Sequence, residues 1–402
     1  MKVLHLCTTD AKGAGLCAYR IHKQLLDHNI ESKMLVLEKH HIDKDVIQVF
    51  KYRFFFFRVY HFFLRLLHIY MNEYDILIRQ TGNRNTLYSR PFLPFDISNN
   101  KYVKEADIIH LHWTDNFFDL PNFLKKINKP IIWTLHDEGL FCGTAHYEID
   151  TIQNDILDLK YREIRKNMIR NRKKTGIVLL SQYFYETYKE HCAIKGCHIR
   201  VINNSVDCSK FQQKDRNISR KRLGISDCKI VFLFIAAKIN DPRKGLDILI
   251  RAVERLNNPD MVILAIGDDK TFQGHKIVKS IGCIYDHDDL SYAISAADYF
   301  VMPSKQEAFA QTPIEAMACG IPSILFPVSG THELINAQNG VLCDECTVDS
   351  LVKGINKAMK FKYCKDEIIE FAKRNYSPSI IINEYIKYYN FLIHSFEEDN
   401  KN

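Results

Sequence analysis

Short runs of apolar residues alternate with helix-like segments along this chain, and the whole alternation occurs twice. The first half contains five strand-like runs: Val3–Cys7, Met34–Leu37, Asp107–His112, Ile131–Leu135 and Ile177–Leu180. The second half contains four, separated by helical segments such as Leu246–Leu256: Ile230–Ala236, Val262–Ile266, Tyr299–Met302 and Ser323–Phe326. Continuous apolar strands between helices are typical of buried parallel sheets. Two such series predict an α/β fold with two Rossmann-like domains facing each other across a cleft.

The boundary between the two predicted domains falls where the chain turns polar, at Val201–Asp215. A chain of 402 residues has room for two domains of ordinary size. We therefore assign residues 1–200 to the first domain and 201–376 to the second. The final predicted helix, about residues 377–402, stays open: it can belong to either domain or pack back on the first.

The excess positive charge lies entirely in the first half of the chain. Residues 1–200 hold 30 lysines and arginines against 22 acids, a net +8, whereas residues 201–402 carry a net −1. This asymmetry indicates that the two halves meet different partners.

Two basic segments carry much of that charge. As a helix, residues 51–71 present one basic stripe on an aromatic and aliphatic surface, which favours a helix lying in a membrane surface over one packed in the domain core. Residues 160–174 contain eight lysines and arginines, which fit either an anionic lipid surface or a solvated helix face. Nucleic acid is a weaker partner because no recognition motif accompanies the charge. No uncharged run reaches the ~18–20 residues that span a bilayer.

Cysteine and acid spacing predicts no metal or redox site. Among twelve cysteines the only CxxC pair is Cys343–Cys346, without a second pair or histidines at metal spacing. So many reduced thiols are typical of a reducing cytosol. The run Asp286–Asp289 resembles a divalent-metal motif, but acids at the start of a helix explain it more simply. His110 and His112 alternate on one strand and are expected to be buried and hydrogen-bonded.

Residues 298–322 carry the most chemical information. They predict a strand, a loop and a helix that starts with Thr312 as N-cap, in a capping box with Glu315, and ends at Gly320. Loop amides and a helix start at the end of a parallel strand form an anion site, which suits a nucleotide diphosphate. Glu307 and Glu315 can face the same crevice and accept hydrogen bonds from sugar and ribose hydroxyls. The alternative is that Glu315 only caps its helix and Glu307 is solvated.

The segment EAFAQTPIEAMACGIP, which starts at Glu307, resembles the E-x7-E signature of retaining GT-B glycosyltransferases of glycosyltransferase family 4. The resemblance covers nearly the whole chain. Further matching segments are the early glycine loop Gly13–Gly15, Ala106–Trp113, Trp133–Asp137, the linker Val201–Asp207 and the R-K-G segment within Asn240–Leu249. The resemblance thus implies the GT-B fold.

The resemblance also implies a role for each matching residue. Glu307 would hold hydroxyls of the donor sugar, Glu315 the ribose, Lys244 the leaving diphosphate, and His136 the donor sugar or the reacting centre. The remaining donor-binding residues would be Gly13, Gly15, Lys238, Gly267, Phe309, Ala310, Gln311 and Thr312. Lys238 stands where the family usually has an arginine, so it supplies charge without a bidentate fork. The linker residues Asn203 and Ser205 also depart from the family pattern.

The expected function is that of a retaining hexosyltransferase that uses a UDP- or GDP-linked sugar and needs no cofactor or essential metal. Its acceptor would be a lipid-linked glycan in bacterial O-antigen, capsule or exopolysaccharide synthesis, at the inner face of the plasma membrane. The departures motivate one alternative, a catalytically degenerate scaffold or nucleotide-sugar binding protein at the membrane. A further alternative is a nucleotide-sugar hydrolase or epimerase on the same fold.

Overall fold

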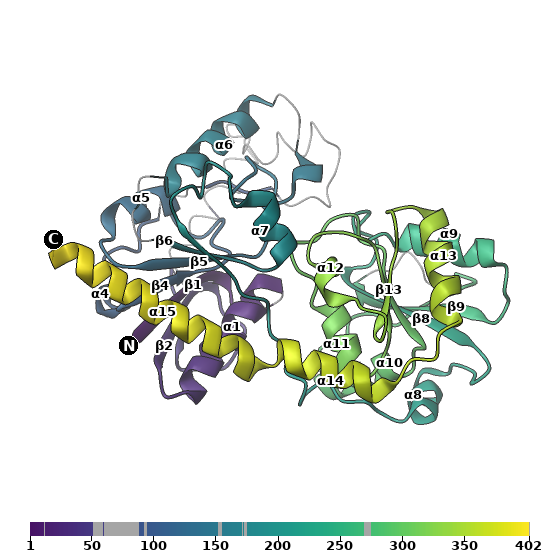
Figure 1. Cartoon of the computed structure of the whole chain (residues 1–402). Coiled ribbons are helices and arrows are strands. Elements are labelled where there is room, and N and C mark those ends of the chain that lie inside the picture. Colours follow the sequence, from purple (N-terminus) through teal and green to yellow (C-terminus); the bar gives the residue numbers. More distant parts are fainter. Residues whose placement is uncertain are drawn as a thin grey trace. The chain divides into compact units, whose positions relative to one another are not determined.

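The structure is a computed structural model that describes residues 1–11, 13–50, 59, 88–91, 95–151, 155–170, 172, 175–268 and 275–401. The chain forms two compact units, each built on its own sheet (Figure 1). Unit 1 comprises Met1–Leu180, Tyr185–Ile202 and Ile382–Asn402, and unit 2 comprises Ser181–Phe184 and Asn203–Ile381.

The sheet of unit 1 has seven parallel strands in the order β3-β2-β1-β4-β5-β6-β7. Its strands are β1 (Lys2–Thr9), β2 (Glu31–Glu38), β3 (Val46–Gln48), β4 (Ile108–Leu111), β5 (Ile131–Leu135), β6 (Thr175–Leu179) and β7 (His198–Val201). The helices before the linker are α1 (Gly13–Asp27), α4 (Lys101–Glu105), α5 (Leu120–Lys126), the 3-10 turn η1 (Glu148–Asp150), α6 (Ile156–Met168) and α7 (Gln182–Tyr188).

The sheet of unit 2 has six parallel strands in the order β10-β9-β8-β11-β12-β13. Its strands are β8 (Ile230–Lys238), β9 (Met261–Asp268), β10 (Val278–Ser280), β11 (Tyr299–Met302), β12 (Ser323–Leu325) and β13 (Gly340–Leu342). The helices are α8 (Arg216–Leu223), α9 (Leu246–Leu256), α10 (His287–Ser295), α11 (Thr312–Ala318), α12 (Thr331–Leu334), α13 (Val348–Met359) and α14 (Lys365–Tyr376).

All nine predicted strands are present, and the four that the sequence did not predict are the edge strands of the two sheets. These are β3 and β7 in unit 1 and β10 and β13 in unit 2. Each has only three or four residues. In β7 exposed and half-buried residues alternate. An edge strand is covered less completely than a central one, so it needs no continuous apolar run.

The last helix, α15 (Pro378–Lys401), packs along the sheet of unit 1 for most of its length. The Tyr388 hydroxyl donates to the carbonyl oxygen of His198 on β7 at 2.5 Å. A Cβ on Gly176 of β6 would lie 2.5 Å from Leu392, so the helix lies directly against the strand. The chain thus returns to its first unit after completing the second.

The segment 51–71 proposed as a membrane helix lies outside the described residues, except for Val59. Among the helices that are described, none combines the length and the apolar content that a membrane crossing requires.

Candidate functional site

Lys244 and Glu307, both singled out in the sequence, form an ion pair in unit 2. The ammonium of Lys244 donates to Oε1 of Glu307 at 2.5 Å. The side chains are 25% and 9% exposed, so the pair is shielded but reachable from solvent. If the pair separates, the cation can bind an anionic group of a ligand and the carboxylate can accept a hydrogen bond from a neighbouring hydroxyl.

Two backbone features bring Lys244 to Glu307. The turn before α9 ends at Gly245, which has φ +78° and lies so close to Pro303 that a Cβ would be 2.2 Å from its carbonyl oxygen. Lys305 N–H then donates to the carbonyl of Arg243 at 2.8 Å. The turn after β8 and the loop after β11 are therefore joined through their backbones, which places the two charged side chains together.

The loop after Glu307 offers backbone donors. Phe309 and Ala310 are buried, and Ser329 donates to the carbonyl of Ala308 at 3.0 Å, which holds the loop in place. Within the described residues, the N–H groups of Phe309 and Ala310 have no hydrogen-bond acceptor. Buried backbone donors are rarely left unpaired, so these two suit the oxygen atoms of a ligand.

The predicted capping box of the next helix is wrong. The N-cap of α11 is Gln311, without a side-chain capping bond, and Thr312 is already the first helical residue. The Gln311 carbonyl accepts from the N–H groups of Ile314 and Glu315, which are the first bonds of the helix itself. Glu315 is buried in the first turn. The predicted end is confirmed, since Gly320 follows α11 with φ +75°.

Gly267 and Lys238 lie at the carboxyl ends of β9 and β8. Gly267 has φ +147°, and a Cβ there would lie 1.8 Å from the carbonyl oxygen of Ala236. Lys238 is exposed and pairs in register with Asp268. In open α/β sheets ligands bind at this edge, so both positions suit a nucleotide.

Gly13 and Gly15 form the first turn of α1, directly after β1 in unit 1. Gly15 lies against the end of that strand, where a Cβ would be 2.4 Å from the Thr9 carbonyl oxygen. The glycine loop is thus at the carboxyl edge of the first sheet, and the other donor-binding candidates except His136 are in unit 2.

His136 follows β5 in unit 1 and ends a chain of buried imidazoles. Its Nε2 lies 3.1 Å from Nδ1 of His112, and Nε2 of His112 lies 3.0 Å from Nδ1 of His5. His110 bonds separately to Tyr389 at 2.7 Å and Thr134 at 2.8 Å. The prediction that His110 and His112 are buried and hydrogen-bonded is confirmed. Burial lowers the pKa of His136 to about 4 and the pKa values of the other three histidines well below their usual range.

Asp137, the next residue, belongs to a buried charged network that sequence reasoning missed. Its Oδ2 accepts from Nδ1 of His146 at 2.7 Å, and Nε2 of His146 lies 3.6 Å from Asp115. Both terminal nitrogens of Arg165 donate hydrogen bonds to the Asp115 carboxylate, at 3.3 and 3.2 Å. The one signal of this charged network in the sequence is that Asp137 directly follows His136.

The pKa values in this network favour charged side chains. Burial pushes the pKa of Asp137 up, but His146, the Gly139 N–H and Arg165 together outweigh it, and the net pKa lies below the ordinary value. Burial lowers the pKa of His146, but Asp137 and Asp115 together outweigh it, and the net pKa is raised. Both directions favour an ionised carboxylate and a protonated imidazole.

The predicted absence of a metal motif remains an expectation, and the candidate motifs have structural roles. Asp286 is the N-cap of α10 and accepts from Asp288 and Asp289, as expected of acids at a helix start. Cys343 is buried, and burial raises the pKa of its thiol to about 12. His5, His110 and His112 place ligand atoms within 4.8 Å of one another, but hydrogen bonds already engage these imidazoles.

The basic run 160–174 is not a uniform solvated stripe, which corrects the sequence interpretation. Arg165 is fully buried, and Arg172 donates to the carbonyls of Leu124, Ile127 and Lys129. Arg162 contacts Glu148. Part of this charge therefore stabilises unit 1 rather than facing a partner.

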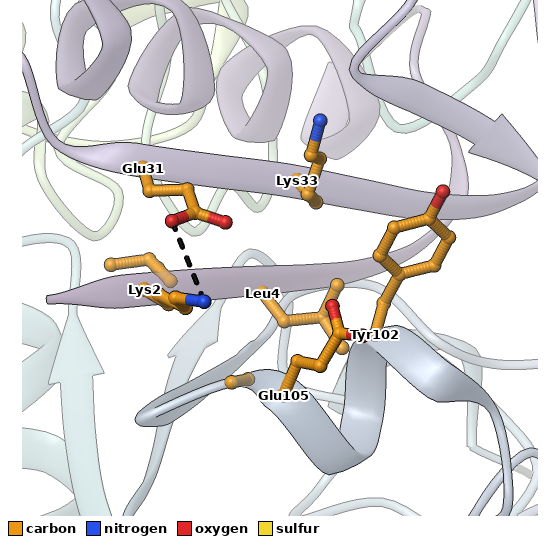
Figure 2. Close-up of a pocket in the computed structure, with 8 residues that line it drawn as sticks. Lys2, Leu4, Glu31, Lys33, Tyr102 and Glu105 are labelled. Carbon is orange, nitrogen blue, oxygen red and sulfur yellow. Dashed lines mark ion pairs between the residues drawn. The ribbon is translucent and has the colours of Figure 1, made fainter.

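A small pocket of about 20 Å³ lies at the amino ends of β1 and β2, beside α4 (Figure 2). The exposed side chains of Lys2 and Glu31 form an ion pair across it at 3.8 Å. Ligands of open α/β sheets bind at the opposite, carboxyl edge, so this pocket is not a candidate site.

Sequence comparison places the two units in known families. Residues 12–210 match Glycosyltransferase Family 4, and residues 215–375 match Glycosyl transferases group 1. An uncharacterized glycosyltransferase of Methanocaldococcus jannaschii is 28% identical over 315 residues, which are 71% of this chain and 76% of that protein.

A second relative is the GPI3 subunit of phosphatidylinositol N-acetylglucosaminyltransferase from Saccharomyces cerevisiae. It is 27% identical over 288 residues, 69% of this chain and 60% of that subunit, so the match spans less than two thirds of its length. Among solved structures, HepE of Anabaena in complex with UDP superposes with a TM-score of 0.65 at 18% identity, over 96% of this chain and 99% of that one. This likeness confirms the GT-B type of α/β fold.

Proposed function

Because the chain belongs to the group 1 glycosyltransferases of family 4, we propose that this glycosyltransferase is a retaining enzyme. It moves a hexose from a UDP- or GDP-linked donor to a hydroxyl acceptor, and it needs no essential metal. The observation that carries the proposal is the Lys244–Glu307 pair beside the unpaired N–H groups of Phe309 and Ala310.

The donor would separate this pair. Its diphosphate takes the ammonium of Lys244, which frees the carboxylate of Glu307 to accept hydrogen bonds from sugar hydroxyls. Negative charge on the diphosphate grows as the sugar leaves, so Lys244 and the loop amides stabilise the transition state more than the bound substrate. Lys238 adds positive charge at the end of β8, and Glu315 would hold the ribose.

In a retaining transfer the acceptor hydroxyl attacks the face from which the diphosphate departs. The hydroxyl proton passes to the departing phosphate, so no side chain has to act as the base. His136 would contact the donor sugar or the reacting centre. A neutral imidazole suits this role, since it leaves the positive charge to the lysines.

The test replaces each member of the pair. Glu307→Ala and Lys244→Ala should each lower transfer from UDP-glucose or GDP-mannose about 100- to 1000-fold, the cost of losing one electrostatic contact to a transition state. Lys305→Ala is the matched control, because Lys305 is an exposed lysine of the same loop. Full transfer by both pair variants would reject the assignment.

The same preparation distinguishes the alternatives. Titration calorimetry that finds no affinity for UDP, GDP or their sugars would favour a degenerate scaffold at the membrane. Release of free sugar without acceptor, or conversion of one nucleotide-sugar into another, would favour a hydrolase or an epimerase.

We further propose a lipid-linked glycan of bacterial surface polysaccharide synthesis as acceptor, met at the cytoplasmic face of the plasma membrane. Ile156 and Leu159, one turn apart on α6, are 84% and 55% exposed, and Lys160 lies beside them. Apolar residues beside a lysine suit an anionic membrane surface. The name of the GPI3 relative includes a lipid, phosphatidylinositol, which agrees with a lipid-linked acceptor.

Vesicle sedimentation tests this contact. Phosphatidylcholine vesicles with phosphatidylglycerol should bind the protein, and Ile156→Asp should weaken binding about tenfold, since it removes buried apolar area and repels anionic lipid. Ile218→Asp on α8 of unit 2, where the isoleucine is also exposed (53%), is the control. Equal binding by both variants would contradict the docking role of α6.

A further inference from the structure

Residues 350–365 of unit 2 contain five lysines and no acidic residue. The lysines are Lys353, Lys357, Lys360, Lys362 and Lys365. Residues 201–402 as a whole hold 25 lysines and arginines against 26 acids, so the total hides this local concentration of positive charge. Like charges gathered on a folded surface repel one another, and they create a field that attracts a partner of opposite charge.

Three of these lysines lie on one face at α13. Lys353 and Lys357 on the helix and Lys360 at its C-cap are exposed, and they are spaced four and three residues apart. This spacing places side chains one above another on a helix. The opposite face, which includes Leu351 and Ile355, is buried in the core of unit 2, where α13 packs against α9, β12 and β13 (Figure 1). Packing thus fixes the helix with these lysines turned outward.

The charge of these lysines is not neutralised by acidic neighbours. Among the described residues, none of the five forms an ion pair or a side-chain hydrogen bond. Asp349, the one acid in the sequence of α13, pairs with Arg255 of α9. By contrast, Lys214, Lys229 and Lys244 of the same unit each contact a carboxylate. The positive charge at α13 therefore faces solvent without a partner in the described part of the chain.

An exposed aromatic ring lies within this positive charge. Phe361 stands between Lys360 and Lys362 in the sequence and is 49% exposed. Its ring centroid lies 4.7 Å from that of Tyr363, which packs against the core of unit 2. The Tyr363 ring therefore supports the exposed Phe361 ring from the side of the core.

The composition of this surface distinguishes between three kinds of anionic partner. Protein interfaces are enriched in arginine and poor in lysine, whereas residues 350–365 contain five lysines and no arginine. Proteins that bind single-stranded nucleic acid stack successive bases on aromatic side chains, and Phe361 is the one exposed aromatic residue of this stretch. Several lysines around one apolar side chain suit the anionic headgroups of a membrane surface and the acyl chains beneath them.

We propose that the surface formed by Lys353, Lys357, Lys360, Phe361 and Lys362, here called the lysine surface, binds an anionic membrane. The lysines approach the phosphate groups of the lipids, and the Phe361 ring enters the boundary between headgroups and acyl chains. The inference goes beyond the proposed function, because this contact forms whether or not the chain transfers a sugar. It is also separate from the contact proposed for α6, which belongs to unit 1.

Vesicle sedimentation with a charge-reversed variant tests the lysine surface. Lys353→Glu/Lys357→Glu should bind phosphatidylcholine vesicles that contain phosphatidylglycerol at least about 25-fold more weakly than the wild type, because each lysine near an anionic surface contributes about fivefold to affinity. Lys221→Glu/Lys276→Glu is the matched control, since it changes the net charge equally at exposed lysines of unit 2 outside the lysine surface. Melting temperatures of both double variants establish that they are folded.

The apolar part of the contact is tested by Phe361→Ser. This variant should weaken vesicle binding about three- to tenfold, and the loss should persist at high salt, since burial of a ring is not screened by ions. The effect of Lys353→Glu/Lys357→Glu should instead shrink as salt is added. Ile218→Ser is the control, because Ile218 is an exposed apolar residue of α8 in the same unit.

The same measurements are repeated with Ile156→Asp added to every variant, so that the lysine surface is separated from the α6 contact. Equal vesicle binding by the charge-reversed variant and its control would overturn the proposal. Equal binding of the wild type to vesicles with and without phosphatidylglycerol would also overturn it. Loss of binding to a fluorescent single-stranded RNA, with vesicle binding unchanged, would replace the membrane by nucleic acid. None of these measurements needs a donor or an acceptor, so their failure is distinct from failure of the proposed transfer.

Discussion

The charged groups of the two units are held in opposite ways. In unit 2, Lys244 and Glu307 lie on two loops that backbone contacts join, and their side chains form a partly exposed ion pair. In unit 1, Asp137 and His136 follow a central strand, and each is the last member of a buried series of side chains. The first arrangement is partly exposed to solvent, whereas the second is held by buried hydrogen-bonded partners.

In the proposed function a leaving diphosphate needs positive charge that can move to it, and the partly exposed Lys244 supplies that charge. In unit 1 the positions of His136 and Asp137 depend instead on buried partners, His112 and His146.

The largest expected effect is on the stability of unit 1. Arg165→Met leaves Asp115 without its buried cationic partner, and should lower the free energy of unfolding by about 3–5 kcal/mol. Lys244→Met removes a partly exposed pair and should cost about 0–1 kcal/mol while transfer is lost. Urea unfolding followed by tryptophan fluorescence measures the first variant, because Trp113 and Trp133 both belong to unit 1. If both variants lost the same free energy of unfolding, the difference between the two units would be contradicted.

A smaller effect per residue is expected on acidification to pH 5.0. His5, His110, His112 and His136 have pKa values lowered by burial, so the unfolded chain binds more protons below its histidine pKa of about 6.5. Stability should then fall between pH 6.5 and about 4, by at most about 1.4 kcal/mol per pH unit for each histidine.

His146 has the opposite effect on the pH dependence of stability. The raised pKa of His146 gives stability that is present at low pH and lost as the pH rises through that pKa. Urea titrations of tryptophan fluorescence at pH 7.5, 6.0 and 5.0 measure the sum. A flat profile would contradict the burial of neutral imidazoles.

The sequence predicted the central strands of both sheets and missed their edge strands. Central strands such as β5 and β11 match their predicted bounds, because a strand covered on both faces must be apolar throughout. Edge strands lack that constraint. The N-cap of α11 was mispredicted for a related reason: Gln311 holds that position without a side-chain capping bond, so no capping side chain marks it in the sequence.

The candidate sites divide in the same way. Glu307 and Gln311 are close in sequence, so a contiguous motif reveals them. Asp115, Asp137, His146 and Arg165 come from separate segments, and no local pattern joins them. The basic run 160–174 was misjudged because sequence gives the charge of Arg165 and Arg172 but not the carbonyls and carboxylate that they meet.

The sequence by itself determined the two α/β units, the parallel sheets and the donor motif, because strand composition and turn residues act over short stretches of chain. Only the tertiary structure decided that Lys244 pairs with Glu307, that α15 returns to unit 1, and that three buried histidines and a charged network converge behind His136 and Asp137. These contacts join residues distant in sequence, and the energy of burying a charge or an imidazole depends on neighbours that only the fold brings together.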